Sequence, residues 1–325
     1  MKVMLLFFLP TLVQALTKGI NFFGFETQTR VVHMLWCQPL EWHINKINEI
    51  GFNSIRVPVS EDFIMSDWET EYPQSGSINP NFPQANMKSI EIMDEFFDLT
   101  AQKNISVILD IHRLYDSSQS PKPFIDNTIY TFVRFMDAWV KILGRYASRP
   151  NLVGIDVFNE YQGNDWSDWK NLAQITINHI ESTYPRRFNF FIEGANWGGQ
   201  LHDAQSNPIT FTDRNLQDRV NYSIHKYWFS DSNIVWDEQA LRESWEYSFG
   251  YLENKVMVGE WGYISTDDKQ VQWAEHFVKY LKDKNIRNTY FWSWNFDSGD
   301  TKGVLLDNCN DVDQNKVQLL HSLWN

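Results

Sequence analysis

Eight short apolar segments, regularly spaced along the chain, constrain the fold more than any other feature of the sequence. They are rich in β-branched and aromatic residues, and several are almost continuously apolar, which is typical of parallel strands buried on both faces. Successive segments begin 32 to 52 residues apart, which leaves room for a crossover helix in every gap. The expected strands cover residues 19–25, 54–60, 106–112, 152–160, 188–194, 221–227, 256–262 and 288–294.

Helical patterns fill several of the gaps. Residues 40–50 place four aliphatic side chains on one face and are followed by Gly51, a residue type that often ends helices. Eight strand–helix units in a row predict an α/β fold, a single (β/α)8 TIM barrel. The alternative, a doubly wound sheet, usually has a glycine-rich first turn, whereas residues 23–26 read Phe-Gly-Phe-Glu. Further helical patterns cover residues 87–102, 131–146, 169–184 and 270–284.

The N-terminus has the pattern of a secretory signal peptide. Lys2 precedes an apolar run of 11 residues at 3–13, which is too short to span a membrane. Ala15 supplies a small residue for cleavage, so residues 1–15 are predicted to be the signal peptide and residues 16–325 the functional domain. The alternatives are a buried N-terminal strand or helix and a membrane-anchored form with an uncleaved N-terminus. We expect a secreted, extracellular protein with no membrane association after cleavage.

Charge and cysteine content narrow the set of partners. The chain has 41 acidic and 28 basic residues, a net charge of −13, which argues against nucleic acid as a partner. The two cysteines, Cys37 and Cys309, are too few for a disulfide scaffold. In a secreted protein they can form one disulfide bond, and two separate buried thiols are an equal alternative.

Polar or aromatic side chains mark the ends of six of the eight expected strands. In a (β/α)8 barrel the carboxyl ends of all strands meet at one face, where active sites lie. Burying an ionisable side chain without a partner costs several kcal/mol, so these side chains are expected to share one polar site. They are Arg56 in the second strand, Asp110 and His112 in the third, Asn159 and Glu160 in the fourth, His225 and Tyr227 in the sixth, Glu260 in the seventh and Trp292 in the eighth.

Two carboxylates of this set, Glu160 and Glu260, indicate a definite reaction. Glycoside hydrolysis requires a carboxylic acid that protonates the leaving oxygen and a second carboxylate that acts as nucleophile or base. The fourth and seventh strands lie on opposite sides of a small barrel, so the two side chains face each other across its mouth. Two carboxylates within a few ångströms of each other cannot both ionise cheaply, so we expect one of the two to have a raised pKa.

The order and spacing of these motifs resemble the family 5 glycoside hydrolases, in particular their bacterial and archaeal endo-1,4-glucanase branch. Three residues depart from the family pattern: Tyr161, Trp261 and Lys302. The resemblance runs from about residue 19 to residue 306. It rests on Gly-Ile-Asn-Phe-Phe-Gly-Phe-Glu at 19–26, Val-Val-His-Met-Leu-Trp at 31–36, Ile-Arg-Val-Pro at 55–58, Asn-Glu at 159–160, Val-Gly-Glu-Trp-Gly at 258–262, Phe-Trp-Ser-Trp-Asn at 291–295 and Ser-Gly-Asp-Thr at 298–301.

The resemblance implies a retaining mechanism with Glu160 as the general acid/base and Glu260 as the nucleophile. Arg56 and Tyr227 are implied to hydrogen-bond Glu260 and keep it ionised. We therefore expect the Glu260 charge to raise the pKa of Glu160. The side chains implied to line the sugar-binding subsite are Asn159, at the sugar 2-hydroxyl, His112, His225 and Trp292, which stacks beneath the ring.

The chain contains 15 tryptophans, and some are expected outside the core. Indole rings stack on the apolar face of sugars, and Trp197 follows the fifth expected strand, where related endoglucanases place a substrate platform. His33, in the loop after the first strand, is a candidate substrate contact or a structural histidine. Trp36, Trp68, Trp228 and Trp236 in loops fit either a platform or the core, whereas Trp42, Trp139, Trp169 and Trp273 in expected helices are expected in the core.

Together these observations predict a secreted endo-β-1,4-glucanase, a cellulase that acts as a monomer on β-glucan polysaccharide or oligosaccharide without a cofactor. No metal is expected, because the oxygen-rich run 307–313 lacks the glycine and distal glutamate of a calcium loop. An endo-β-mannanase or another β-glucanase fits the same motifs. The alternative of a different class is a non-catalytic carbohydrate-binding protein, and the presence of both glutamates argues against it.

Overall fold

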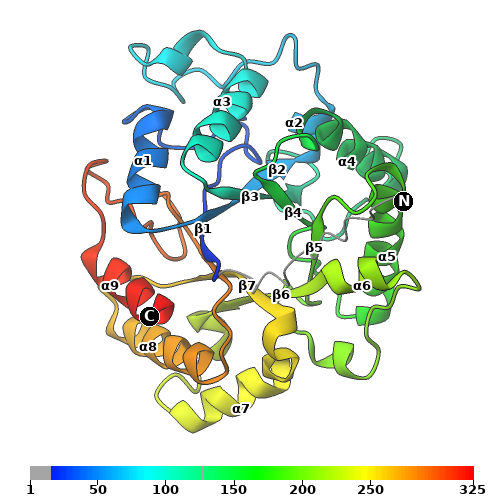
Figure 1. Ribbon diagram of the computed structural model, residues 1–325. Coiled ribbons are helices and arrows are strands. Elements are labelled where there is room, and N and C mark those ends of the chain that lie inside the picture. Colours follow the sequence, from blue (N-terminus) through cyan, green and yellow to red (C-terminus); the bar gives the residue numbers. More distant parts are fainter. Residues whose placement is uncertain (1–15, 126) are drawn as a thin grey trace, which may run out of the picture.

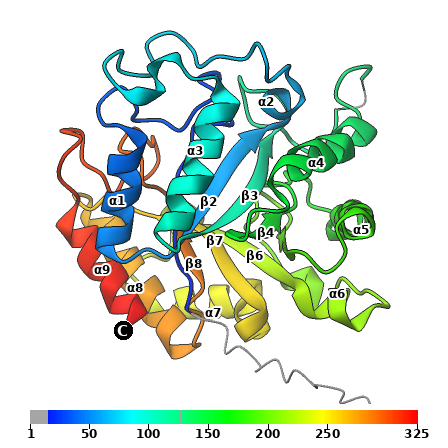
Figure 2. The same ribbon diagram turned by 45° about the horizontal axis from the view of Figure 1, so that its top comes forward.

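A computed structural model describes residues 16–125 and 127–325, so the predicted signal peptide at 1–15 lies outside the described residues. Eight parallel strands form one closed barrel in sequence order, with the first strand paired to the last, and helices surround them (Figures 1 and 2). The predicted (β/α)8 TIM barrel is confirmed. The strands are β1 (Lys18–Asn21), β2 (Ser54–Ser60), β3 (Ser106–Arg113), β4 (Leu152–Asp156), β5 (Asn189–Glu193), β6 (Val220–Tyr227), β7 (Val256–Gly262) and β8 (Thr289–Phe291).

The five predicted helices are present, each within three residues of its expected bounds. In α1, the aliphatic face is buried and the helix ends at Gly51, whose φ of 104° is left-handed. Four helices were not predicted: α2, α6, α7 and α9. The α-helices are α1 (Leu40–Ile50), α2 (Glu61–Met65), α3 (Ser89–Gln102), α4 (Phe132–Tyr146), α5 (Trp166–Thr183), α6 (Arg214–Arg219), α7 (Glu238–Ser248), α8 (Asp268–Asp283) and α9 (Gln314–Trp324).

Three strands end earlier than the apolar pattern indicates. The predictions of 19–25, 152–160 and 288–294 extend too far, because β1, β4 and β8 end at residues 21, 156 and 291. The apolar pattern continues past these ends because residues such as Phe22 and Phe158 are fully buried without being part of the strand ladder. The shortening turns the segment before Glu160 into a loop at the barrel mouth.

Apolar side chains fill the barrel interior at its amino-terminal end. Ile108, Met257 and Tyr290 form a small buried cluster there, separate from the main core between strands and helices. The Tyr290 ring fits because Gly19 has no side chain, and a Cβ at that position would lie 2.4 Å from the ring. Of the tryptophans predicted in the core, three are fully buried, Trp139, Trp169 and Trp273, and Trp42 is half-buried.

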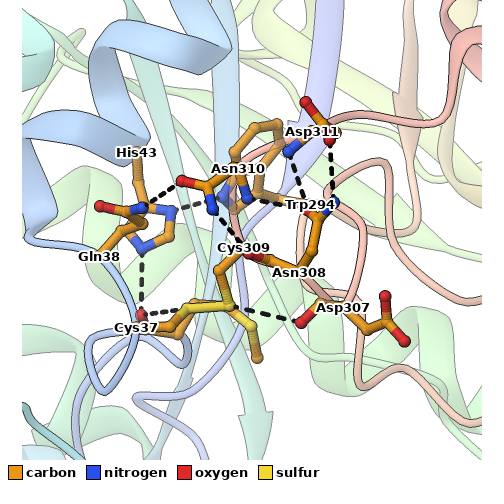
Figure 3. The surroundings of a disulfide bond; sticks show 10 residues. Cys37, Gln38, His43, Trp294, Asp307, Asn308, Cys309, Asn310 and Asp311 are labelled. Atoms are coloured by element: carbon orange, nitrogen blue, oxygen red, sulfur yellow. Dashed lines mark hydrogen bonds between the residues drawn. A yellow bond between two sulfur atoms is a disulfide. The ribbon is translucent and has the colours of Figure 1, made fainter.

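A disulfide bond joins Cys37 and Cys309, which are 272 residues apart in sequence (Figure 3). Their Cα atoms lie 6.1 Å apart, and Gln38 Nε2 donates to Asn310 Oδ1 beside them. Of the two alternatives for the cysteines, the structure therefore has the bonded one. The bond ties the loop after β1 to the loop after β8. Within the described residues, no helix has the length and apolar character needed to cross a membrane.

Candidate active site

A cavity of about 820 Å³ opens at the carboxyl end of the barrel. Its walls come from the ends of β3, β6 and β7, from the segments that follow β4, β6 and β8, from the loop 196–202 and from α7. Arg56, Asp110 and Asn159 are fully buried behind the cavity wall, and His33 lies outside the lining residues. The other seven residues predicted for the site all line the cavity: His112, Glu160, Trp197, His225, Tyr227, Glu260 and Trp292.

The guanidinium of Arg56, in β2, joins the site from inside the barrel. Its nitrogen atoms lie 2.6 to 3.1 Å from oxygen atoms of residues on or just after five other strands. Burial alone would lower the pKa of Arg56, but the surrounding carboxylates raise it well above its ordinary value, so the positive charge is permanent. Its partners are Asn21, Asp110, Asp156, Asn159, Glu193 and Glu260.

Glu260, in β7, is held by two donors. Arg56 Nη1 lies 2.6 Å from its Oε1, and the Tyr227 hydroxyl donates to its Oε2 at 2.8 Å. Burial and the Glu260 charge raise the pKa of Tyr227 well above its ordinary value, so the hydroxyl keeps its proton. A register shift between β6 and β7 pairs His225 with Glu260. Gly259 permits this approach, because a Cβ there would lie 3.0 Å from His225 Nε2.

Glu160 lies just after β4, in a left-handed backbone conformation with φ 49°. Its Oε1 is 3.1 Å from His225 Nδ1, and its backbone N–H donates to Glu193 Oε2 at 2.6 Å. Burial raises the pKa of Glu160 to about 7, and the Glu260 charge adds to this against the hydrogen bond from His225. The sequence predicted the Glu260 charge as the cause. Burial is the larger cause, because only 19% of the side chain is exposed.

The two glutamates approach each other closely. One carboxylate oxygen of Glu160 and one of Glu260 lie within 4.8 Å of each other, and a ring nitrogen of His225 is within the same distance of both. The three side chains come from three different strand ends, β4, β6 and β7. A molecule bound between the carboxylates would therefore meet two acid–base groups at once.

His112, in β3, is fixed in one neutral form. Burial lowers its pKa to about 3, so the ring carries a single proton at neutral pH. Its Nδ1 lies 2.6 Å from Asp110 Oδ2, and Asn159 Nδ2 lies 3.2 Å from its Nε2. The proton is therefore on Nδ1, and Nε2 accepts from Asn159. Because Asn159 also accepts from Arg56 at 3.0 Å, both ends of its amide are fixed. Its predicted contact with a sugar hydroxyl stays a prediction.

Two buried carboxylates of the site, Asp156 and Glu193, were not among the side chains expected there, whereas the third, Asp110, was expected at the shared polar site. Glu193 Oε1 lies 3.0 Å from Arg56 Nη2 and 3.1 Å from His225 Nε2. Burial would raise the pKa of Glu193, but His225 and Arg56 lower it to about 2. Conversely, the Glu193 and Glu260 charges overcome the effect of burial on His225 and raise its pKa well above the ordinary value. His225 is therefore an imidazolium beside Glu160.

Aromatic rings line two parts of the cavity. Trp292 is half-buried, and the rings of Phe23 and His112 lie nearly parallel to it, with centroids 5.4 and 5.5 Å away. Trp197 is 48% exposed in the loop after β5. His33 contacts Asp297, with Nδ1 3.0 Å from Oδ2, and packs against Phe23. The remaining loop tryptophans lie outside the lining residues: Trp36, Trp68, Trp228 and Trp236.

Two groups of side chains have the spacing of metal ligands. They are Asp156, Glu193 and His225, and Glu160, His225 and Glu260, each with ligand atoms within 4.8 Å of one another. In the first group, Arg56 binds both carboxylates, at 2.9 and 3.0 Å. Arg56 would therefore compete with a metal ion for these two carboxylates.

Comparison with known proteins gives consistent matches over most of the chain. The family model of cellulase (glycosyl hydrolase family 5) matches residues 13–298. An endoglucanase of Paenibacillus polymyxa is 29% identical over 94% of this chain and 82% of its own length. The major extracellular endoglucanase of Xanthomonas campestris pv. campestris is also 29% identical, over 94% of this chain and 67% of its own. The solved catalytic domain of the major endoglucanase from that organism has a TM-score of 0.85 at 27% identity, covering 95% of this chain and 94% of that domain.

Proposed function

The chain belongs to the cellulase family, glycosyl hydrolase family 5, and from this membership we propose that it is a secreted, retaining endo-β-1,4-glucanase. It is a glycoside hydrolase, and relatives named endoglucanases match it over 94% of its length. The proposed substrate is a β-1,4-linked glucan, polymeric or oligomeric, bound across the cavity at the barrel mouth.

The mechanistic part of the proposal rests on the separation of the Glu160 and Glu260 carboxylates. Oxygen atoms of Glu160 and Glu260 lie within 4.8 Å of each other. Retaining glycosidases hold their two carboxyl groups about 5–5.5 Å apart, whereas inverting enzymes need about 6.5–9.5 Å to admit a water molecule. The short separation favours direct attack on the sugar by one carboxylate.

The charges around the two glutamates support their division of roles. Glu260 contacts the permanent cation Arg56, which suits an ionised nucleophile, whereas the raised pKa of Glu160 suits a proton donor. In the first step, Glu260 attacks the anomeric carbon, and the glycosidic C–O bond breaks as Glu160 protonates the leaving oxygen. In the second, Glu160 takes a proton from water, the water oxygen attacks the anomeric carbon, and the ester to Glu260 breaks.

The Glu260 charge also changes the pKa of Glu160 between the two steps. While Glu260 is a free carboxylate, its charge raises the pKa of Glu160. In the ester that charge is absent, so the pKa of Glu160 falls and its carboxylate becomes available as a base.

Hydrolysis of a cellulo-oligosaccharide is expected to release the β-anomer first, because two successive inversions at the anomeric carbon retain its configuration. Proton NMR of the anomeric signals, recorded before mutarotation, checks this. Early α-anomer would contradict the double displacement. A rapid loss of viscosity with carboxymethylcellulose, and not with mannan, is the matching test of the substrate.

The alkaline limb of the kcat/KM profile is expected near pH 7. Glu160 must be protonated to act as the acid, and burial raises its pKa to about 7. Activity therefore stays high below this pKa and falls about tenfold for each pH unit above it. The profile is measured on an unactivated cellulo-oligosaccharide, whose leaving group requires the proton. A limb near pH 4.5 would show that burial does not act on Glu160 in this way.

A Glu260→Gln variant separates the two causes of this pKa. Removing the Glu260 charge is expected to lower the pKa of Glu160, and burial is expected to keep it above the free value of about 4.3. Titration of the carboxyl carbon by NMR gives the pKa directly. A value that drops fully to the free one would assign the shift to Glu260 alone.

Secretion is supported by two separate observations. One relative is named a major extracellular endoglucanase, and disulfide bonds such as Cys37–Cys309 persist mainly in oxidising compartments. We propose that residues 1–15 are a cleaved signal peptide and that the catalytic domain spans 16–325. N-terminal sequencing of the mature protein is expected to begin at Leu16, and an intact Met1 would contradict cleavage.

A further inference from the structure

The cavity has a wall that the chemistry above does not use. This wall consists of the loop 196–202, Phe229 from the segment after β6, and Ser244, Tyr247 and Ser248 from α7. Helix α7 lies on the side of the barrel formed by β6 and β7 (Figure 1). The space between the two glutamates therefore continues toward α7.

Exposed aromatic side chains are concentrated on this wall. Among the described residues, five aromatic side chains are highly exposed, and three of them line the cavity: Trp197, Phe229 and Tyr247. Tyr247 is 68% exposed, although the opposite face of α7 is buried in the core. Its ring stacks on His202, with centroids 4.9 Å apart and planes at 19°. A large flat ring held in this way offers one face to a ligand.

Hydrogen bonds hold the wall in place. The Leu201 N–H donates to Ser248 O at 3.2 Å, and Ser248 Oγ donates to Gly199 O at 3.0 Å. The Tyr251 hydroxyl donates to Leu201 O at 2.7 Å. These bonds join the loop that carries His202 to the helix that carries Tyr247, so the backbones that carry the stacked pair are held together.

The position of the wall relative to Glu160 decides which part of a substrate it meets. The loop 196–202 is bonded to the segment that follows the proposed acid: Trp197 N–H donates to Tyr161 O, and Asn196 N–H to Gly163 O, both at 3.0 Å. The acid protonates the oxygen that leaves, so the leaving sugar lies beside Glu160. The wall from Trp197 to Tyr247 therefore lies along the leaving-group part of a bound glucan chain.

We propose that Tyr247, backed by His202, is a distal aromatic platform for a glucose unit in the leaving-group part of a β-1,4-glucan, beyond the unit next to Trp197. The ring meets the apolar C–H face of the sugar, and polar side chains of the same wall, Asn196, Gln200 and Ser244, meet its hydroxyls. This inference rests on the proposed function and extends it, because only long chains reach Tyr247. The platform thus favours polymeric over short substrates.

The test compares kcat/KM for cellohexaose with that for p-nitrophenyl cellobioside, whose small leaving group ends near Glu160. The ratio of the two values is expected to fall about tenfold in Tyr247→Ala, the effect of one lost stacking ring. It is expected to stay within about twofold in Tyr247→Phe, which keeps the ring. Trp236→Ala is the matched control, because Trp236 is 65% exposed and lies outside the cavity lining.

The possible outcomes separate this inference from the proposed function. An unchanged ratio in Tyr247→Ala overturns the platform. An equal loss on both substrates also overturns it, because a structural defect does not depend on substrate length. Wild-type protein that cleaves neither glucan substrate would overturn the proposed function itself, before any variant is compared, and the platform with it.

Discussion

Alanine in place of Glu260 is expected to lower kcat on a β-1,4-glucan by about 10⁴-fold or more. Without this carboxylate no glycosyl ester can form, and water must attack the sugar directly. Arg56 and the Tyr227 hydroxyl, which contact Glu260 at 2.6 and 2.8 Å, then lack the charge that they hold in place. Steady-state kinetics on a soluble glucan give the loss in kcat.

Two further variants show whether the loss in kcat comes from the missing nucleophile or from misfolding. Glu260→Gln keeps the side-chain shape and is expected to be equally inactive, because an amide is not a nucleophile here. Glu275→Ala removes an exposed glutamate of α8 and is expected to keep full activity. Thermal unfolding midpoints close to the wild-type value would exclude misfolding. A Glu260→Ala protein with more than a few per cent of wild-type kcat would contradict its role as nucleophile.

The barrel was predictable because its signal is repeated eight times. Each apolar run alone is compatible with a strand or with a buried helix, but eight runs with helix-length gaps have few other solutions. The bounds of β2 and β7 were predicted correctly, since polar residues flank β2 on both sides and β7 lies between Lys255 and its own last residue, Gly262. Helix α7 was missed, because only three of its 11 residues are buried and its pattern is mostly polar. Helix α9 was also missed, although it has a clear apolar face, because its pattern lies beyond the last expected strand and not in a gap between two strands.

The site was only partly predictable, because strand position does not give side-chain direction. Glu193 ends β5, just as polar residues end the neighbouring strands, so the same signal was available and was not used. Asp156 differs, since it lies within the apolar run 152–160 and its role depends on where the β4 ladder ends. In a continuously apolar strand, no alternation shows which residues point inward. The contact of Asp156 with Arg56 inside the barrel therefore required the structure.

Alanine in place of Glu160 is expected to have an effect that depends on the leaving group. On a β-1,4-glucan, loss of the proton donor is expected to lower kcat/KM by about 10²–10⁴-fold. With dinitrophenyl cellobioside the first step needs little protonation and is expected to stay fast. The second step still needs Glu160 as the base, so the glycosyl enzyme accumulates. A burst of dinitrophenolate followed by slow turnover is the expected time course.

Azide provides the deciding measurement on the Glu160→Ala variant, because it attacks the glycosyl enzyme without needing a base. Turnover of dinitrophenyl cellobioside is expected to rise with azide concentration, and the product is expected to be the β-glycosyl azide. In Glu260→Ala, azide would instead replace the nucleophile and give the α-azide by a single inversion. The two products can be told apart by the anomeric coupling constant in proton NMR. An α-azide from Glu160→Ala would show that the roles of the two glutamates must be exchanged. The azide product is needed for this assignment, because oxygen atoms of both side chains lie within 4.8 Å of each other beside the same imidazolium, and their positions alone do not distinguish them.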